Sequence, residues 1–313
     1  MPVGRIGSLF RAGIYGHNTT RVRASWRIAV PILIGLVVFV VSFVLGSMLP
    51  IPQGRAQVVP FLVTPLVVCA VVWRTGPWLD NRSIRAYGFS LSRTWWVQAG
   101  GGVILGVLII AITLFLSVLL GSAALAPSGT AGEPVSIVWL SLFCLGFAGV
   151  ALWEELVFRG VFIVNGIEGI SAGGYPRTIA VSTALFGSVV IFALVHIPGG
   201  VAEGHPAWLI AMWTASLGLL TGVGFLLTGE LALPMGAHFA INFVPINVIG
   251  LSPTANMTGV PTVLAIESAT TGLAAPMFGP LTVANLIGCV GILGWYSWRR
   301  GGAKPGELLI TNP

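Results

Sequence analysis

The sequence predicts an all-α, polytopic membrane protein: a bundle of about eight transmembrane helices with both termini on the cytoplasmic side. Of its 313 residues, 56% are hydrophobic and only 8% are charged, and the mean hydropathy is +0.96. Because a soluble domain carries about 25% charged residues, this chain cannot cover a surface that faces water. The bilayer is therefore its expected solvent. We expect no nucleic-acid partner despite the net charge of +6, because the basic residues lie between the apolar runs.

Eight apolar stretches are long enough to be transmembrane helices, since about 20 residues cross the hydrocarbon core. We expect them at residues 28–49, 56–73, 95–121, 136–162, 179–197, 207–228, 231–250 and 276–298. The stretch 56–73 is the shortest and contains Pro60 and Pro65, which a membrane helix tolerates where its neighbours satisfy the freed carbonyl groups. Trp73 and Trp95 stand at expected helix ends, where aromatic residues anchor helices at the interface.

The distribution of basic residues predicts the orientation. With eight helices and an inner N-terminus, 14 of the 15 Lys and Arg residues lie on the inner side, and Arg55 alone lies outside. The outer loops 122–135, 198–206 and 251–275 contain no Lys or Arg. Cytoplasmic loops carry the excess of positive charge in membrane proteins, so this pattern favours an even number of crossings.

Three ionisable residues interrupt an apolar run in ALWEELVFRG, residues 151–160. A charged group in the middle of a membrane helix costs about 2.5–3.5 kcal/mol, so it persists where it faces the bundle interior and a partner. Arg159 follows Glu155 by four residues, which places the two on one helix face, and we expect a structural ion pair. Glu154 points about 100° away with no cation nearby in the sequence. Such a carboxylate suits a general base.

Two other expected helices contain polar residues at helical spacing. FALVH places Phe192 one turn before His196, and HFAIN places His238 one turn before Asn242. A buried glutamate, two histidines and an asparagine are more than packing requires, so they form a candidate site. The two remaining histidines are expected in solvent: His17 in the basic N-terminal segment and His205 in an outer loop.

The absence of other motifs narrows the chemistry. The chain has no HExxH and no GxSxG motif, and its one aspartate, Asp80, lies in an expected loop. We therefore expect Glu154 to activate a water with help from His196, while His238 and Asn242 polarise the carbonyl and stabilise its oxyanion. The same Glu154, His196 and His238 could instead hold Zn²⁺, because two histidines and a carboxylate form a catalytic zinc arrangement. The sequence leaves both schemes open, and no cofactor is certain.

The three motifs together resemble the signatures of the CPBP family, EExxxR, FxxxH and HxxxN, in the order EELVFRG, FALVH and HFAIN. This family comprises CAAX-type prenyl endopeptidases and bacteriocin-processing enzymes, also called Abi proteins. The resemblance implies intramembrane peptide-bond hydrolysis with Glu154 as base and His196, His238 and Asn242 assisting. Glu155, Arg159 and Phe192 would support them. The implied substrate is a peptide or a membrane protein.

On this basis the chain divides into five segments. They are a basic cytoplasmic segment 1–27, the first three transmembrane helices 28–135, a CPBP/Abi-like protease core 136–250, an outer loop 251–275, and the last helix with its cytoplasmic tail 276–313. The many Arg, Ala, Gly and Val residues indicate a bacterial protein of the inner (plasma) membrane. Two other readings compete with a protease: a non-catalytic membrane scaffold with the same fold, and a transporter that uses Glu154 as a proton site. No paired repeats favour the transporter.

One expectation concerns depth in the membrane. If the fifth helix begins at residue 179, His196 lies near its outer end, too far from Glu154 for a shared site. We therefore expect residues 163–178 to fold into the bundle.

Overall fold

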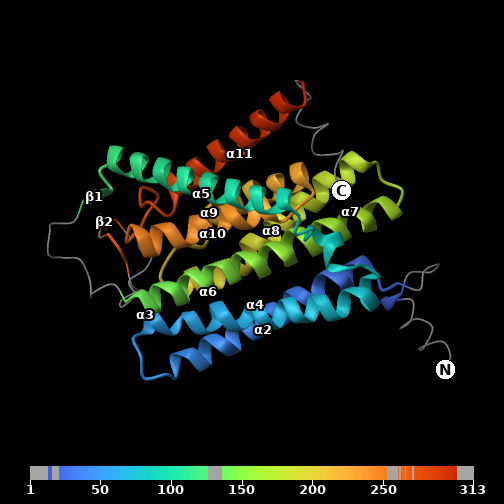
Figure 1. Cartoon of the computed structure of the whole chain (residues 1–313), viewed down its shortest axis with the longest axis horizontal. Coiled ribbons are helices and arrows are strands. Elements are labelled where there is room, and N and C mark those ends of the chain that lie inside the picture. Colours follow the sequence, from blue (N-terminus) through green and yellow to red (C-terminus); the bar gives the residue numbers. More distant parts are fainter. Residues whose placement is uncertain are drawn as a thin grey trace.

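The computed structural model describes residues 13–15, 21–125, 136–251, 260, 262–264, 266–269 and 271–301. Within these ranges the chain is an all-α bundle with one small antiparallel sheet of two strands, as the composition predicts (Figure 1). Its elements are α2 Ala24–Ser47, α3 Gln53–Ala56, α4 Val58–Thr75, η1 Gly76–Asp80, η2 Ile84–Tyr87, α5 Arg93–Leu119, β1 Ala123–Leu125, α6 Ile137–Glu155, η3 Leu156–Val161, α7 Phe162–Ala172, α8 Arg177–Ala202, α9 Ala207–Thr228, α10 Ala232–Phe243, η4 Val244–Val248, β2 Ile266–Ser268 and α11 Gly279–Arg299.

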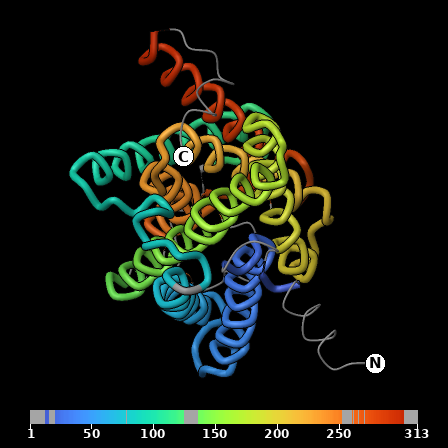
Figure 2. The backbone as a smooth tube through the Cα atoms, turned by 90° about the vertical axis from the view of Figure 1, so that its right-hand side faces the viewer, coloured from blue at the N-terminus to red at the C-terminus, as the bar shows by residue number. Residues whose placement is uncertain are grey.

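In the described part of the chain, seven helices are long and apolar enough to cross a membrane. They are Ala24–Ser47, Gln53–Thr75, Arg93–Leu119, Ile137–Ala172, Arg177–Ala202, Ala207–Thr228 and Gly279–Arg299. Of these, α9 is the most enclosed, with 72% of its most apolar stretch buried. Seen from one end, α2 and α4 lie on one side of the bundle, while α5 and α11 lie on the opposite side (Figure 2).

The expected helix 231–250 is the exception to these seven. It is α10 of 12 residues followed by the π-helix η4 of five. The segment nevertheless runs between the two ends of the bundle. At its start, the amide of Leu231 donates to the carbonyl of Gly88, just before α5 begins. Beyond its end, β2 pairs with β1, which follows α5, and α10 packs along α5 between these points. Counted with the seven long helices, this short segment gives eight segments that run between the two ends of the bundle in the described part of the chain, as predicted.

The helix that carries Glu154 is longer than the predicted 136–162. It continues through η3 and α7 to Ala172, because the Gly-rich stretch after residue 163 stays helical and packs against α8. The next helix begins at Arg177 and ends at Ala202, so the predicted bounds 179–197 were too narrow. Glu154 lies 18 residues before Ala172, and His196 lies 19 residues after Arg177. The two antiparallel arms of this hairpin thus hold both residues at matching depth. The expectation that residues 163–178 fold into the bundle is met only by 163–170, because residues 171–178 are exposed at the tip of the hairpin.

Small residues set the contact between α5 and α10. A Cβ atom at Gly102 of α5 would lie 2.3 Å from the carbonyl oxygen of Leu233, and one at Gly236 of α10 would lie 2.1 Å from that of Ala99. Real Cβ atoms never approach backbone so closely, so only glycine fits here. This close approach of backbones is how small residues pack membrane helices. It fixes α10, and with it His238, against α5.

A cluster of charged side chains joins the start of α2 to η1 and α7. Three arginines meet two carboxylates, with Arg21 2.8 Å from Glu168, Arg82 2.6 Å from Glu168, and Arg27 paired with Asp80. Asp80, expected in a loop, is instead the last residue of the π-helix η1, and it is buried. Burial alone would raise the pKa of the Asp80 carboxyl, but hydrogen bonds from Tyr87 and Arg27 hold that pKa below its ordinary value. We call Arg21, Arg27, Arg82, Asp80 and Glu168 the ionic cluster.

His205 does not lie in solvent as predicted. Only 6% of it is exposed, because its ring packs edge-on against Phe278 just before α11, with the ring centres 4.9 Å apart. An outer loop of a membrane protein can fold back on apolar neighbours, and a loop sequence with few charges gives no signal that distinguishes this burial from exposure. His17 lies outside the described residues, as does part of the loop 251–275, in which β2 is ordered.

Candidate active site

Glu154 lies at the end of α6 and is 7% exposed. Its Oε2 atom is shielded from solvent and forms no hydrogen bond within the described part of the chain. Two ring nitrogens approach this oxygen. Nε2 of His196, from α8, lies 3.8 Å away, and Nε2 of His238, from α10, lies 3.7 Å away. Three helices thus bring three of the predicted site residues together around one carboxylate oxygen.

The tautomer of His196 follows from its second ring nitrogen. Nδ1 lies 2.7 Å from the carbonyl oxygen of Phe192, one turn earlier on α8. Because a carbonyl oxygen can only accept, Nδ1 must carry the hydrogen. The Nε2 of a neutral His196 is then an acceptor that faces Glu154. The side chain is 29% exposed, so the site is open on the side of this histidine.

His238 is held by the second glutamate of the motif. Its Nδ1 lies 2.7 Å from Oε1 of Glu155, and the other oxygen of Glu155 lies 3.2 Å from Nε of Arg159. These three side chains are at most 2% exposed. The predicted pair between Glu155 and Arg159 is therefore present, and it continues to His238. The opposite charges of Glu155 and Arg159 compensate each other, as two buried charges must.

A π-helix separates the glutamates from the rest of the long helix. The segment η3 begins at Leu156, directly after Glu155, and ends at Val161. Such widened turns are rare in proteins overall, and those that do occur are often found at functional sites. This one keeps Arg159 buried beside Glu155, so the widened turn belongs to the local geometry of the site.

Asn242 is the predicted site residue that the structure joins least closely to the others. It lies one turn after His238 on α10 and is half-buried. Among the described residues, no hydrogen bond links its side chain to Glu154, His196 or His238. Its place on the same helix face as His238 leaves it within reach of a group bound beside that histidine.

Residues 134–244 match the family model described as Type II CAAX prenyl endopeptidase Rce1-like. All three motifs fall inside this match, and Glu154, His196 and His238 meet in the structure as the motifs would require. This part of the chain is therefore similar to the CPBP/CAAX protease family. No curated protein matches the chain, and no solved structure matches it either. Members of the CPBP/CAAX family are in general proteases, and a multi-pass bundle embedded in lipid suits them.

The CPBP/CAAX motif residues provide donor atoms of the types that bind zinc, and a zinc site would require a particular spacing between them. Bonds of about 2.0–2.1 Å to a tetrahedral Zn²⁺ would place the ligand atoms roughly 3.3 Å apart. The Nε2 atoms of His196 and His238 lie 3.8 and 3.7 Å from Oε2 of Glu154. Among the described residues, no group of three or more His, Cys, Asp or Glu side chains is arranged to hold a metal ion. The side chains as placed do not fit zinc.

Two contacts of the CPBP/CAAX motif residues were missed by sequence reasoning. The carbonyl oxygen of Gly218 on α9 accepts a hydrogen bond of 3.2 Å from Nη2 of Arg159. A backbone acceptor has no signature in the sequence. The ring of Phe192 packs 4.4 Å from the guanidinium carbon of Arg159 and 4.5 Å, centre to centre, from the His196 ring. The motif names this phenylalanine, but its contact with the arginine could not be foreseen.

Proposed function

We propose that this protein is an intramembrane endopeptidase in which Glu154 activates a water molecule to hydrolyse a peptide bond. One observation carries the proposal. Oε2 of Glu154 is buried without a hydrogen-bond partner in the described structure, and two imidazole nitrogens face it from 3.7 and 3.8 Å. These separations exceed a direct hydrogen bond and suit a bridging water. The similarity of residues 134–244 to a family model of prenyl endopeptidases supports the same reaction class.

The first step uses the acceptors that surround this water. The water donates one hydrogen to Oε2 of Glu154 and the other to Nε2 of neutral His196, whose Nδ1–H is held by Phe192. As the water oxygen attacks the carbonyl carbon of the substrate, its proton passes to the Glu154 carboxylate. Glu154 is then the acid that delivers this proton to the leaving amine nitrogen as the C–N bond breaks. General acid–base catalysis of this kind contributes about 10²–10⁴-fold to the rate.

The second requirement is a donor for the developing oxyanion. A doubly protonated His238 would be suited to this task, because it would donate from Nε2 while Glu155 accepts from its Nδ1. With His238 protonated, the charges of Glu154, Glu155, Arg159 and His238 cancel, which a buried site favours. The side-chain amide of Asn242, one turn away on α10, would add a second donor.

The substrate of this reaction would be a peptide or the tail of a membrane protein that enters from the cytoplasmic side. The chain would act in the inner (plasma) membrane of a bacterium. His238 is six residues from the start of α10, or about 9 Å along the helix. By the orientation that the basic residues predict, the site then lies at a moderate depth below the inner surface of the membrane.

Cleavage of a peptide library by the purified protein in lipid nanodiscs tests the proposal. We expect Glu154→Gln and His196→Ala to reduce cleavage by about 10²–10⁴-fold. Glu267→Gln, on the strand β2, is a matched control that should leave cleavage unchanged. Cleavage that survives both substitutions would reject the catalytic assignment. If no form cleaves, and Glu154→Gln supports the same cellular phenotype as wild type, the chain is a non-catalytic scaffold.

A further inference from the structure

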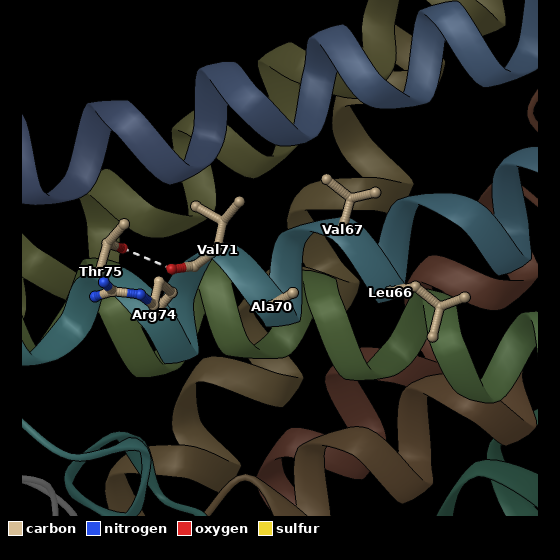
Figure 3. Close-up of a pocket in the computed structure, with 6 residues that line it drawn as sticks. All are labelled: Leu66, Val67, Ala70, Val71, Arg74 and Thr75. Carbon is tan, nitrogen blue, oxygen red and sulfur yellow. Dashed lines mark hydrogen bonds between the residues drawn. The ribbon is translucent and has the colours of Figure 1, made fainter.

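A shallow groove of about 520 Å³ runs along one face of α4, away from the candidate active site. Its lining residues are Leu66, Val67, Ala70, Val71, Arg74 and Thr75. Figure 3 shows them in a row along the helix, with Leu66 at one end and Arg74 and Thr75 at the other. The spacing of one and four residues keeps all six on one face. The groove is thus apolar along most of its length and has the guanidinium group of Arg74 at one end.

The dimensions of the groove match one leaflet of a bilayer. From Leu66 to Arg74 the helix rises about 12 Å, and half of the hydrocarbon core is about 15 Å thick. Arg74 stands in the last turn of α4, next to the exposed Trp73, and tryptophans mark the membrane interface. An acyl chain that follows the apolar part would therefore bring its headgroup to the level of Arg74.

Arg74 differs from the three arginines of the ionic cluster. Arg21, Arg27 and Arg82 are paired with carboxylates in the ionic cluster. The side chain of Arg74 is exposed, and it forms no ion pair or hydrogen bond with any other described residue. The hydroxyl of Thr75 beside it donates to the carbonyl oxygen of Val71, 2.7 Å away. The groove therefore offers one uncompensated positive charge at its polar end.

We propose that this groove binds an anionic phospholipid of the inner leaflet, with the acyl chain against Leu66, Val67, Ala70 and Val71 and the phosphate on Arg74. The cytoplasmic leaflet is the one that carries anionic lipids, and the positive-inside pattern places Arg74 there. A zwitterionic lipid carries its own cation beside the phosphate, so it gains less from Arg74. The proposal concerns binding alone and does not depend on the protease activity.

Native mass spectrometry of the purified full-length protein, titrated with phosphatidylglycerol or phosphatidylethanolamine, tests this inference. We expect wild type to retain phosphatidylglycerol preferentially and Arg74→Gln to lower its affinity about five-fold, the ratio for one basic residue near an anionic surface. Arg74→Lys should keep most of the affinity. Ala70→Phe should weaken binding while keeping the charge, because the exposed Ala70 lines the apolar part of the groove.

Arg93→Gln is the matched control. Arg93 begins α5 at the same end of the bundle, is exposed, and does not line the groove. Equal loss of phosphatidylglycerol in Arg74→Gln and Arg93→Gln would overturn the proposal, because it would reflect general charge attraction. Equal binding of the two lipids to wild type would overturn it too. Competition by inorganic phosphate at the same concentration as the lipid would assign the cation to a free anion and reject a lipid site.

Discussion

Nδ1 of His238 lies 2.7 Å from Oε1 of Glu155, and this contact makes the second glutamate of the motif the partner of a candidate catalytic histidine. The same carboxylate faces Arg159 with its other oxygen. Glu155 thus stands between a fixed cation and a histidine that can gain or lose a proton. In the proposed mechanism, Glu155 orients His238 through this contact.

Glu155→Gln should lower kcat by about 10–100-fold, the range for groups that orient a ligand or a catalytic side chain from behind. The amide oxygen of glutamine can still accept from Nδ1 of His238, so the ring stays oriented while the charge is lost. Peptide cleavage rates of the variant and of Glu267→Gln give the comparison. A loss as large as that of Glu154→Gln would assign Glu155 a direct part in the chemistry, against the role proposed here.

Arg159→Met should destabilise the protein by about 3–5 kcal/mol, because it leaves the buried charge of Glu155 without its cation. The double variant Glu155→Gln with Arg159→Met should lose less than the sum of the two single variants, because neither charge is then stranded. Unfolding in detergent, followed by circular dichroism for all four forms, measures this coupling. Strict additivity would show that the two residues do not interact in the folded protein.

Gly102→Ala should displace α10 from α5 and reduce both stability and cleavage. The added Cβ would lie 2.3 Å from the carbonyl oxygen of Leu233, which cannot be accommodated without moving the helix that carries His238. The neighbouring Gly101→Ala is the control, since a Cβ there meets no atom within 4 Å. Alanine should make that position neutral or up to about 1 kcal/mol more stable. Equal thermal midpoints for the two variants would contradict the close packing of these helices.

Asp80→Asn should cost stability at neutral pH and cost less in acid. The folded protein holds the pKa of Asp80 below its ordinary value of 3.8, so the unfolded chain takes up a proton first as the pH falls. The stabilising effect is therefore fully present above that value and is lost as the pH falls through the folded pKa. The difference between the thermal midpoints of wild type and Asp80→Asn should narrow as the pH falls from 7 to 3. A difference in thermal midpoint that stays constant with pH would show that the charge of Asp80 does not stabilise the ionic cluster.

Chelation should leave peptide cleavage unchanged, because the proposed mechanism moves protons between Glu154, His196 and a water. Elemental analysis of the purified protein before and after treatment with a chelator gives the direct measurement. We expect zinc well below one atom per chain. Loss of activity on chelation, restored by Zn²⁺, would instead make Glu154, His196 and His238 metal ligands, the alternative that the sequence left open.

The sequence was sufficient to predict the charged pair because that contact depends on local spacing. Glu155 and Arg159 are four residues apart, and this spacing alone predicts their contact. The convergence of Glu154, His196 and His238 was predicted from three motifs in separate helices. What each of these side chains does in catalysis stays a prediction.

Helix lengths and burial were harder to predict, because they depend on packing. Residues 163–172 contain glycines and a glutamate that favour a loop, yet contacts with α8 keep them helical. The segment 231–250 is apolar enough for a full crossing, but its α-helix ends at Phe243 and gives way to the π-helix η4. His205 is buried by Phe278, which lies more than 70 residues away in the sequence.

The widened turn at η3 has a consequence for the whole rod from Ile137 to Ala172. One additional residue in a turn changes the rotational phase of everything beyond it by about 100°. Removing a residue from this segment would therefore rotate Asn165 and Glu168 away from Arg27 and Arg82. The orientation of Glu154, which precedes the segment, would not change. Because of this one widened turn, a single continuous helix can present Glu154 to the candidate active site and Glu168 to the ionic cluster from two different faces.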